Sequence, residues 1–337
     1  MSDHSRRPVL VADIGGTNAR FALADTTSRH PLLEASIKRY RVADFATPED
    51  AVHQYIRDTG LTPRQAVFAV AGHIYQGTVN ATNSPWEISV TELCRKLDLD
   101  SADLINDFAA QSLSLPLLGP KDVVRLGEPD VPAIGSAASQ TFAVVGPGTG
   151  LGVGALLLRD GHFEALGTEG GHTGFAPDTP EEIDILRFLA TRFGHVSKER
   201  LISGDGLSLI HEALMAIDGT PGTPLTPEDI TAQAQTGDAG CTRAIEHFCA
   251  IFGAVAGDAV LALGGWDGVY LAGGLPPRLL SWLTQSTFRE RFEAKGRLGD
   301  ILRRTPSLVV IHPHAGLLGA AASAVVMRGG SLLPGKA

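Results

Sequence analysis

The stretch DIGGTNAR (residues 13–20) stands between two short apolar runs, Val9–Ala12 and Phe21–Ala24. The apolar runs predict two strands, because they are short and β-rich. The residues between them predict a tight turn that is rich in Gly and Thr. Together they predict a β-hairpin near the start of the chain.

The stretch GPGTGLG (residues 146–152) repeats this pattern in the second half of the chain. It stands between the apolar runs Phe142–Val145 and Val153–Leu158. Further short strands alternate with helical patterns, so the class is α/β. Two similar hairpins, one in each half, predict two related α/β domains that face each other across a cleft.

The division between the two domains follows from two features. The Pro- and Gly-rich stretch Leu117–Pro120 is the expected crossing point, and the Ala-rich helix predicted from about Gly316 to Met327 is expected to return to the first domain. We therefore expect residues 1–117 and 312–337 to form a smaller domain, and residues 118–311 to form a larger one.

Composition limits the possible partners. Hydrophobic residues make up 44% and charged residues 19%, which allows a sizeable core and argues against wholesale disorder. The net charge is 28 − 37 = −9, with no basic stripe, so nucleic acid and anionic membranes are poor partners. The apolar stretch 249–266 is interrupted by Asp258, and the stretch 315–327 is too short to span a bilayer. Three scattered Cys fit a reducing compartment, so a cytoplasmic protein is expected.

The first Gly-rich turn has the chemistry of an anion site. Gly15 and Gly16 lack Cβ atoms, so backbone N–H groups can approach an anion closely, and Thr17 and Asn18 add neutral donors. Asp13 at the end of a strand is suited to hold a metal through water. The turn has no Gly-Lys-Ser/Thr ending, and a strand rather than a helix is predicted to follow, so neither a Walker loop nor a Rossmann fingerprint is present. An ordinary hairpin turn is the alternative.

Two further glycine clusters have the same character. Gly148, Thr149 and Gly150 offer an approachable backbone and one hydroxyl donor. The pair Gly273-Gly274 follows a predicted strand and precedes a predicted helix, so a flat base or a ribose can lie against that turn. Accidental glycine density in a turn is the alternative for both.

Asn106 and Asp107 follow the short apolar strand Leu104–Ile105, at the end where α/β proteins place ligands. A carboxylate there can accept a proton from an attacking hydroxyl. Both residue types also cap helices well, and a helix is predicted from Phe108, so a capping role stays open.

Glu169 and His172 belong to the stretch EGGH, and Glu199 follows a predicted helix cap at Ser197. Carboxylate, imidazole and amide groups suit a polyol, because they make directional hydrogen bonds with vicinal hydroxyls. A solvated first-turn acid is the alternative for Glu199, and a loop histidine with satisfied hydrogen bonds is the alternative for His172. A zinc site is disfavoured, since the HExxH spacing is absent.

The motifs DIGGTNAR, ATNSPW, LINDF, GPGTGLG, EGGH, HVSKERLISG, YLAGG and HPHAGLLG occur in this order over about residues 8–322. This order resembles the bacterial glucokinase family of the hexokinase, actin and chaperone superfamily. The resemblance implies two ribonuclease-H-like domains of the actin and hexokinase type around a central cleft. It also implies transfer of the γ-phosphate of MgATP to the 6-hydroxyl of glucose at the entry to glycolysis, commonly by a homodimer.

The resemblance also assigns residues. It makes Asp107 the catalytic base, and it makes Asn106, Glu169, His172 and Glu199 sugar ligands. Asn83, in the stretch ATNSPW, is a further candidate for the sugar side. The candidates for the nucleotide side are Asp13, Gly15, Gly16, Thr17, Asn18, Gly148, Thr149, Gly150, Gly273 and Gly274.

The sequence departs from the family pattern at two positions. Pro147 stands where a small residue is commoner, and Asp205 stands where Pro is frequent. Both departures bear on nucleotide affinity rather than on the reaction. No Cys lies between Cys94 and Cys241, which argues against the sister repressor–kinase family with its Cys-rich zinc motif.

Three other functions remain to be separated by experiment. A kinase for mannose, fructose or an amino sugar would carry the same motifs, and the donor is not fixed by them. A non-catalytic sugar sensor would be expected to lack Asp107 or a phosphate loop, and both are present. A polyphosphate hydrolase would not need Glu169, His172 and Glu199.

Overall fold

A five-stranded sheet contains the first Gly-rich hairpin. The computed structural model describes residues 8–82, 84–220 and 222–333. The strand order in this first sheet is β3 (Leu32–Arg41), β2 (Asn18–Ala24), β1 (Val9–Ile14), β4 (Gln65–Val70) and β7 (Ser101–Asn106). Strands β1, β2 and β3 pair antiparallel, whereas β4 and β7 run parallel to β1. The predicted hairpin is therefore present as β1 and β2.

The second sheet repeats this order. Its strands are β11 (His162–Thr168), β10 (Leu151–Arg159), β9 (Ser139–Pro147), β12 (Gly268–Leu271), β13 (Ser307–Val310) and β8 (Val123–Leu126). Strands β9, β10 and β11 pair antiparallel, and β12 and β13 continue parallel to β9. β8 adds one antiparallel strand at the far edge. The prediction of two related α/β units, each starting with a Gly-rich hairpin, is confirmed.

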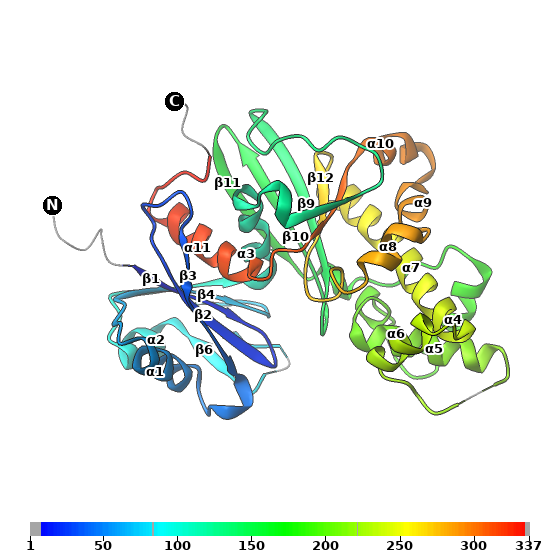
Figure 1. Cartoon of the computed structure of the whole chain (residues 1–337), viewed down its shortest axis with the longest axis horizontal. Coiled ribbons are helices and arrows are strands. Elements are labelled where there is room, and N and C mark those ends of the chain that lie inside the picture. Colours follow the sequence, from blue (N-terminus) through cyan, green and yellow to red (C-terminus); the bar gives the residue numbers. More distant parts are fainter. Residues whose placement is uncertain (1–7, 83, 221, 334–337) are drawn as a thin grey trace.

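Two helices fill the space between the sheets, α3 (Asp107–Ser114) and α11 (Ala315–Met327) (Figure 1). α11 packs against β1, β4 and α3, and α3 packs against β10 and β11. The small side chains of α11 let it lie close to α3: a Cβ added at Gly319 would meet the backbone oxygen of Ala110 at 1.7 Å. The last helix thus returns to the first sheet, and the domain boundaries at residues 117 and 312 stay a prediction.

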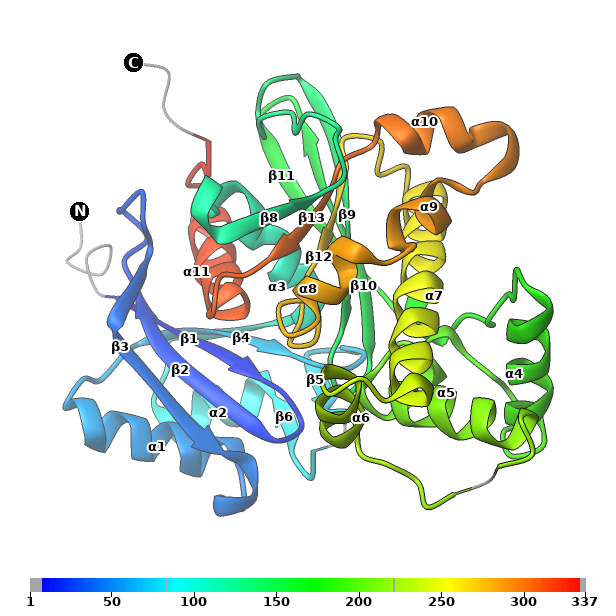
Figure 2. The ribbon, with the colours of Figure 1, turned by 45° about the vertical axis from the view of Figure 1, so that its right-hand side comes forward.

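The outer faces of the two sheets carry the remaining helices. Against the first sheet lie α1 (Pro48–Thr59) and α2 (Val90–Leu97), next to the short strands β5 (Thr78–Asn80) and β6 (Glu87–Ser89). On the far side of the second sheet lie α4 (Pro180–Ala190), α5 (Gly204–Ile217), α6 (Pro227–Gln235), α7 (Ala239–Leu263), α8 (Leu280–Gln285), α9 (Phe288–Glu293) and α10 (Gly299–Arg304) (Figure 2). Short 3-10 helices are η2 (Val42–Asp44), η3 (Leu115–Leu117), η4 (Pro120–Asp122), η5 (Gly170–His172), η6 (Lys198–Arg200) and η7 (Gly296–Leu298).

Three helices begin with the same local sequence, Thr-Pro followed by two acidic residues. Thr47, Thr179 and Thr226 each cap their helix by accepting a hydrogen bond from the backbone N–H three residues later. Pro takes the first helical position, where its missing N–H costs nothing, and the acids lie at the positive end of the helix dipole. These starts are fixed by local sequence alone.

Helix α7 is the central helix of the second core. It is the one helix of the described chain that is long and apolar enough to cross a membrane by length and composition. However, 78% of its most apolar stretch is buried inside the structure. Its side chains pack with those of α5, α6, α9 and β9, so it serves as a core helix.

Candidate active site

A central cavity of about 710 Å³ opens between the two sheets. Its lining combines both Gly-rich turns, the end of β7 and the loop after β11. Thirteen of the predicted site residues line it: Asp13, Gly15, Gly16, Asn106, Asp107, Gly148, Thr149, Gly150, Glu169, His172, Glu199, Gly273 and Gly274. Residues from distant parts of the chain therefore meet as the motif order predicted.

Three candidates do not share this placement. Thr17 and Asn18 are not among the residues that line the cavity. The side-chain oxygen of Asn18 accepts a hydrogen bond of 3.0 Å from Arg39 on the neighbouring strand β3. Asn83 lies outside the described residues, although its neighbour Thr82 lines the cavity.

The glycines of the two turns leave open space. A Cβ added at Gly148 would meet nothing within 4 Å, and one added at Gly15 would meet only the backbone oxygen of Asn18 at 3.8 Å. Neither glycine has the left-handed backbone conformation that excludes other residues. The fold itself therefore does not require glycine at either position, and their role toward a ligand stays a prediction.

Asp13 and Arg20 face each other on the hairpin of β1 and β2. The Arg20 Nη1 atom donates a 2.9 Å hydrogen bond to the Asp13 carboxylate. Helix α11 begins beside this pair, since a Cβ added at Gly316 would lie 2.8 Å from Asp13 Cγ. The positive end of a helix thus approaches the carboxylate.

Asn106 and Asp107 mark the junction of β7 and α3. The Asn106 side-chain oxygen accepts hydrogen bonds from the backbone N–H groups of Phe108 and Ala109, at 2.9 and 3.1 Å. Asn106 is therefore the N-cap of α3, and its amide oxygen is engaged in the cap. The capping alternative from the sequence holds for this oxygen, and the residue also lines the cavity.

The pKa of the Asp107 carboxyl group is higher than the usual value of an aspartate. Burial raises its pKa to about 6, and the negative charges of Asp13 and Glu169 add to the rise. A hydrogen bond of 3.0 Å from the Phe108 N–H favours the charged form and limits the shift. Such a carboxylate is ionised at neutral pH yet has an affinity for protons, which suits a general base.

Glu169, His172 and Glu199 gather on one side of the cavity and are called the acid–histidine cluster below. The His172 Nε2 atom lies 3.9 Å from a Glu169 oxygen, and its Nδ1 atom lies 3.9 Å from a Glu199 oxygen. Glu169 and His172 are more than half exposed, at 55% and 59% of their side-chain surface. At 3.9 Å the three side chains are too far apart to hydrogen-bond one another, so their oxygens and ring nitrogens can still bond a ligand in the cavity.

Glu199 is held by the second Gly-rich turn. Its Oε2 atom accepts a 2.9 Å hydrogen bond from the Leu151 N–H. A Cβ added at Gly150 would lie 2.4 Å from the same oxygen, so this contact depends on glycine at position 150. The turn and the acid–histidine cluster are therefore physically coupled.

A smaller, mostly apolar cavity of about 260 Å³ lies next to the central one. Its walls include Leu207 of α5, Thr231 of α6, and Leu275 and Leu279, which follow the Gly273-Gly274 turn. Gly273 has φ +85°, and an added Cβ would meet the Pro147 backbone oxygen at 2.8 Å, so this turn lies against the second hairpin. Arg278 lines both cavities.

Three ionisable residues of the central cavity were not predicted from the sequence: Arg20, Arg278 and His312. Each stands inside or beside a recognised motif, since Arg20 ends DIGGTNAR, Arg278 follows the glycine pair, and His312 begins HPHAGLLG. Nothing in the local pattern marks them, because only the tertiary fold shows which side of each loop faces the cavity.

The repeated sheets, the paired Gly-rich turns and the carboxylate between them define a sugar kinase of the two-domain actin and hexokinase type. A family model described as Glucokinase matches residues 10–327. The chain belongs to the glucokinase family. The family resemblance, the fold class and the expected glucose kinase function are confirmed at this level.

The relatives support this at high coverage. A glucokinase of Xylella fastidiosa (strain 9a5c) is 52% identical over 321 residues, which are 94% of this chain and 95% of the relative. A glucokinase of Xanthomonas euvesicatoria pv. vesicatoria (strain 85-10) is 52% identical over 319 residues, with 95% of each chain covered. The crystal structure of a glucokinase from an Antarctic psychrotroph has a TM-score of 0.81 at 34% identity and covers 94% of this chain and 98% of that chain.

Proposed function

We propose that the chain transfers the γ-phosphoryl group of ATP to the 6-hydroxyl of D-glucose, with Asp107 as the general base. The glucose oxygen forms a bond to the γ-phosphorus, and the bond from phosphorus to the β,γ-bridging oxygen breaks. The hydroxyl proton passes to the Asp107 carboxylate. Glucose 6-phosphate and ADP are the products. The observation that carries the proposal is the placement of Asp107 in one cavity with both Gly-rich turns and the acid–histidine cluster.

The acid–histidine cluster is the proposed sugar side. Glu169, His172 and Glu199 offer directional hydrogen bonds to hydroxyls, and Asn106 lies next to the base. Groups that pair with a hydroxyl strongly disfavour sugars that lack it, because the protein group is then left unpaired. Asn83 remains a further candidate for this side.

The nucleotide is proposed to extend from the smaller cavity to the Gly-rich turns. The apolar walls around Leu207 and Leu279 suit a flat base, and the Gly273-Gly274 turn lines the neighbouring central cavity. The open backbone at Gly15 and Gly148 suits phosphate oxygens. Arg278 borders both cavities, and no described side chain pairs with its guanidinium group, so it is available to the phosphates between base and turns.

Magnesium is proposed to enter with the nucleotide. Mg²⁺ prefers oxygen ligands and is usually held by one or two carboxylates together with phosphates and water. Asp13 fits this role through a bridging water, because it lines the cavity near Asp107. No group of three or more His, Cys, Asp or Glu side chains suited to a metal occurs among the described residues. When bound, the ion offsets charge on the phosphate oxygens.

The cellular setting follows from the same family. We expect a cytoplasmic homodimer that acts at the entry to glycolysis. Cys94, Cys241 and Cys249 are free thiols, which suits a reducing compartment. Sedimentation equilibrium of the purified chain tests the homodimer, since a single species of monomer mass would contradict it.

The experiment that tests the function is a coupled assay for glucose 6-phosphate with glucose and MgATP. Glucose is expected to give the highest kcat/KM in a panel with mannose, fructose and glucosamine. Preference for another sugar would keep the reaction class and change the substrate. Binding of ATP without phosphorylation of any sugar in the panel would contradict the kinase and favour a sensor.

A further inference from the structure

Asp258 is the one charged residue in the apolar carboxyl-terminal part of helix α7, residues 248–263. Its carboxylate accepts a 2.7 Å ion pair from Lys295 and a 3.2 Å ion pair from Lys198. The side chains of Lys198 and Lys295 are only 17% and 10% exposed and that of Asp258 is 35% exposed, so these pairs are partly shielded from water and are screened less than fully exposed pairs. Asp258 therefore joins α7 to two other segments of the chain, those of Lys198 and Lys295.

Lys198 connects this charge to the active site. It is the residue directly before Glu199, and both belong to the 3-10 helix η6. Successive side chains in a 3-10 helix point about 120° apart. Lys198 reaches α7, while Glu199 reaches the Leu151 N–H and the cavity.

The segment around Lys198 also holds the loop that carries His172. The Lys198 N–H donates a 2.9 Å hydrogen bond to the Thr173 backbone oxygen. The His195 Nε2 atom lies 2.8 Å from the His172 backbone oxygen, within hydrogen-bonding distance. The loops of His172 and Glu199 are thus joined to each other, and the pair of Lys198 with Asp258 ties the joined loops to α7.

We infer that Lys198 is a positioning residue for the sugar: its ion pair with Asp258 fixes the acid–histidine cluster against the buried helix α7. This inference rests on the proposed function, because it assigns the role through Glu199. Lys295 pairs with the other carboxylate oxygen of Asp258, Oδ1, whereas Lys198 pairs with Oδ2. Lys295 reaches the carboxylate because α7 has Gly257 there, where an added Cβ would lie 2.7 Å from Lys295 Cε.

The test compares Lys198→Met with Lys198→Arg and Lys295→Met. Glucose binding is measured by calorimetry without nucleotide, and kcat and both KM values are measured in the coupled assay. Lys198→Met is expected to weaken glucose binding roughly tenfold and to change the KM for ATP much less, since small misplacements of binding groups have large effects. Lys198→Arg keeps the charge and is expected to restore most of the affinity. Lys295→Met leaves Lys198 paired and is expected to change glucose binding less than Lys198→Met does.

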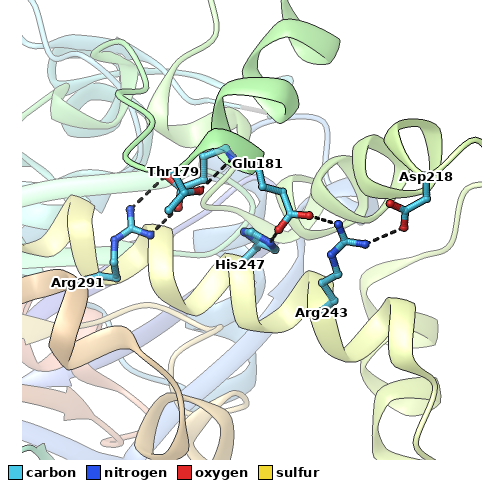
Figure 3. Close-up of polar contacts among 7 residues, drawn as sticks. Thr179, Glu181, Asp218, Arg243, His247 and Arg291 are labelled. Carbon is cyan, nitrogen blue, oxygen red and sulfur yellow. Dashed lines mark hydrogen bonds and ion pairs between the residues drawn. The ribbon is translucent and has the colours of Figure 1, made fainter.

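The matched control is Arg243→Met, which removes ion pairs from the same helix at a place remote from the cluster. Arg243 pairs with Glu181 and Asp218, and His247 of α7 also bonds Glu181 (Figure 3). This variant is expected to lower the thermal unfolding temperature and to keep glucose affinity. A double-mutant cycle with Asp258→Asn then checks that the effect of Lys198→Met depends on Asp258.

Two results would overturn the inference. One is a loss of stability in Lys198→Met with unchanged glucose affinity, and the other is an equal loss of glucose affinity in Lys198→Met, Lys295→Met and Arg243→Met. Failure of the proposed function has a different signature, because the unmodified chain would then neither bind nor phosphorylate glucose.

Discussion

The backbone N–H of Leu151 donates a 2.9 Å hydrogen bond to the carboxylate of Glu199. Leu151 is the first residue of β10, directly after the second Gly-rich turn. The bond therefore links the proposed phosphate side of the site to the proposed sugar side. A substitution in the second Gly-rich turn is therefore expected to affect sugar binding through Glu199.

Gly150→Ala tests this link. The new methyl group would lie 2.4 Å from Glu199 Oε2, so the flexible carboxylate must move away and lose its bond to Leu151. A carboxylate that has moved can no longer bond the sugar as proposed. Loss of one charge-assisted hydrogen bond between Glu199 and glucose corresponds to about 1.5–3 kcal/mol, or roughly ten- to hundredfold weaker binding. Calorimetric titration with glucose measures this. Unchanged glucose affinity would show that Glu199 does not contact the sugar.

Gly148→Ala separates a ligand role from a role in folding. Its Cβ would enter open space, so the thermal unfolding temperature is expected to stay within the error of measurement. A phosphate that approaches this backbone would meet the methyl group, and the KM for ATP is expected to rise about tenfold, equivalent to one lost hydrogen bond to a charged group. Steady-state kinetics with varied ATP provides the measurement. Wild-type kinetics in a stable variant would contradict the assignment of this turn to the phosphates.

Asp107→Asn removes the proposed base and keeps the shape of the side chain. The amide oxygen can still accept the hydrogen bond from the Phe108 N–H, so the start of α3 is expected to stay intact. We expect kcat to fall roughly 10²- to 10⁴-fold, which is the usual contribution of a general base. Asp103→Asn on the same strand is the control, because Asp103 is not among the residues that line the cavity. A kcat close to that of the wild type in Asp107→Asn would remove Asp107 from the mechanism.

The activity is expected to depend on pH through the same carboxyl group. The base must be deprotonated, and the pKa of Asp107 is raised to about 6 in the free protein. As the pH falls below about 6, kcat/KM for glucose should therefore decrease about tenfold per pH unit. A pH profile from 4.5 to 8, with saturating ATP, checks this. Constant kcat/KM down to pH 5 would be inconsistent with a raised pKa at the base.

Arg291→Met is expected to destabilise the fold without touching the site. Arg291 on α9 bonds both carboxylate oxygens of Glu182 on α4, and the Glu182 side chain is only 1% exposed. Removing one partner leaves a buried carboxylate unpaired, which costs about 3–5 kcal/mol in the free energy of unfolding. Urea denaturation measures the change. The control Arg187→Met breaks an exposed pair with Asp184, and a similar loss there would contradict the role of burial.

Local sequence determined much of the fold. The two hairpins and the three Thr-Pro helix starts were predictable because each depends on residues that are neighbours in the chain. The edge strands β3 and β11 were not predicted, because both are largely exposed and carry little apolar alternation. They are held in the sheets by backbone hydrogen bonds to β2 and β10 rather than by burial of their own side chains.

The candidate site shows the same division. Residues in compact motifs, such as Asp107 and Glu169, were recognised and line the cavity. Arg278 and His312 were not, because their position depends on loops from distant segments that meet only in the folded chain. Lys198 gave no signal beside Glu199, since its partner Asp258 is remote in sequence and lies on another helix.

The return of α11 to the first sheet has a consequence for biosynthesis. β1 is synthesised well before α11, the helix that covers it, and Arg328 also bonds Thr26 at 2.7 Å. The apolar face formed by Val9, Val11 and Val67 therefore stays without this cover until α11 has left the ribosome. Nascent chains that stop before α11 are thus expected to expose this face and to aggregate more readily than chains that include the helix.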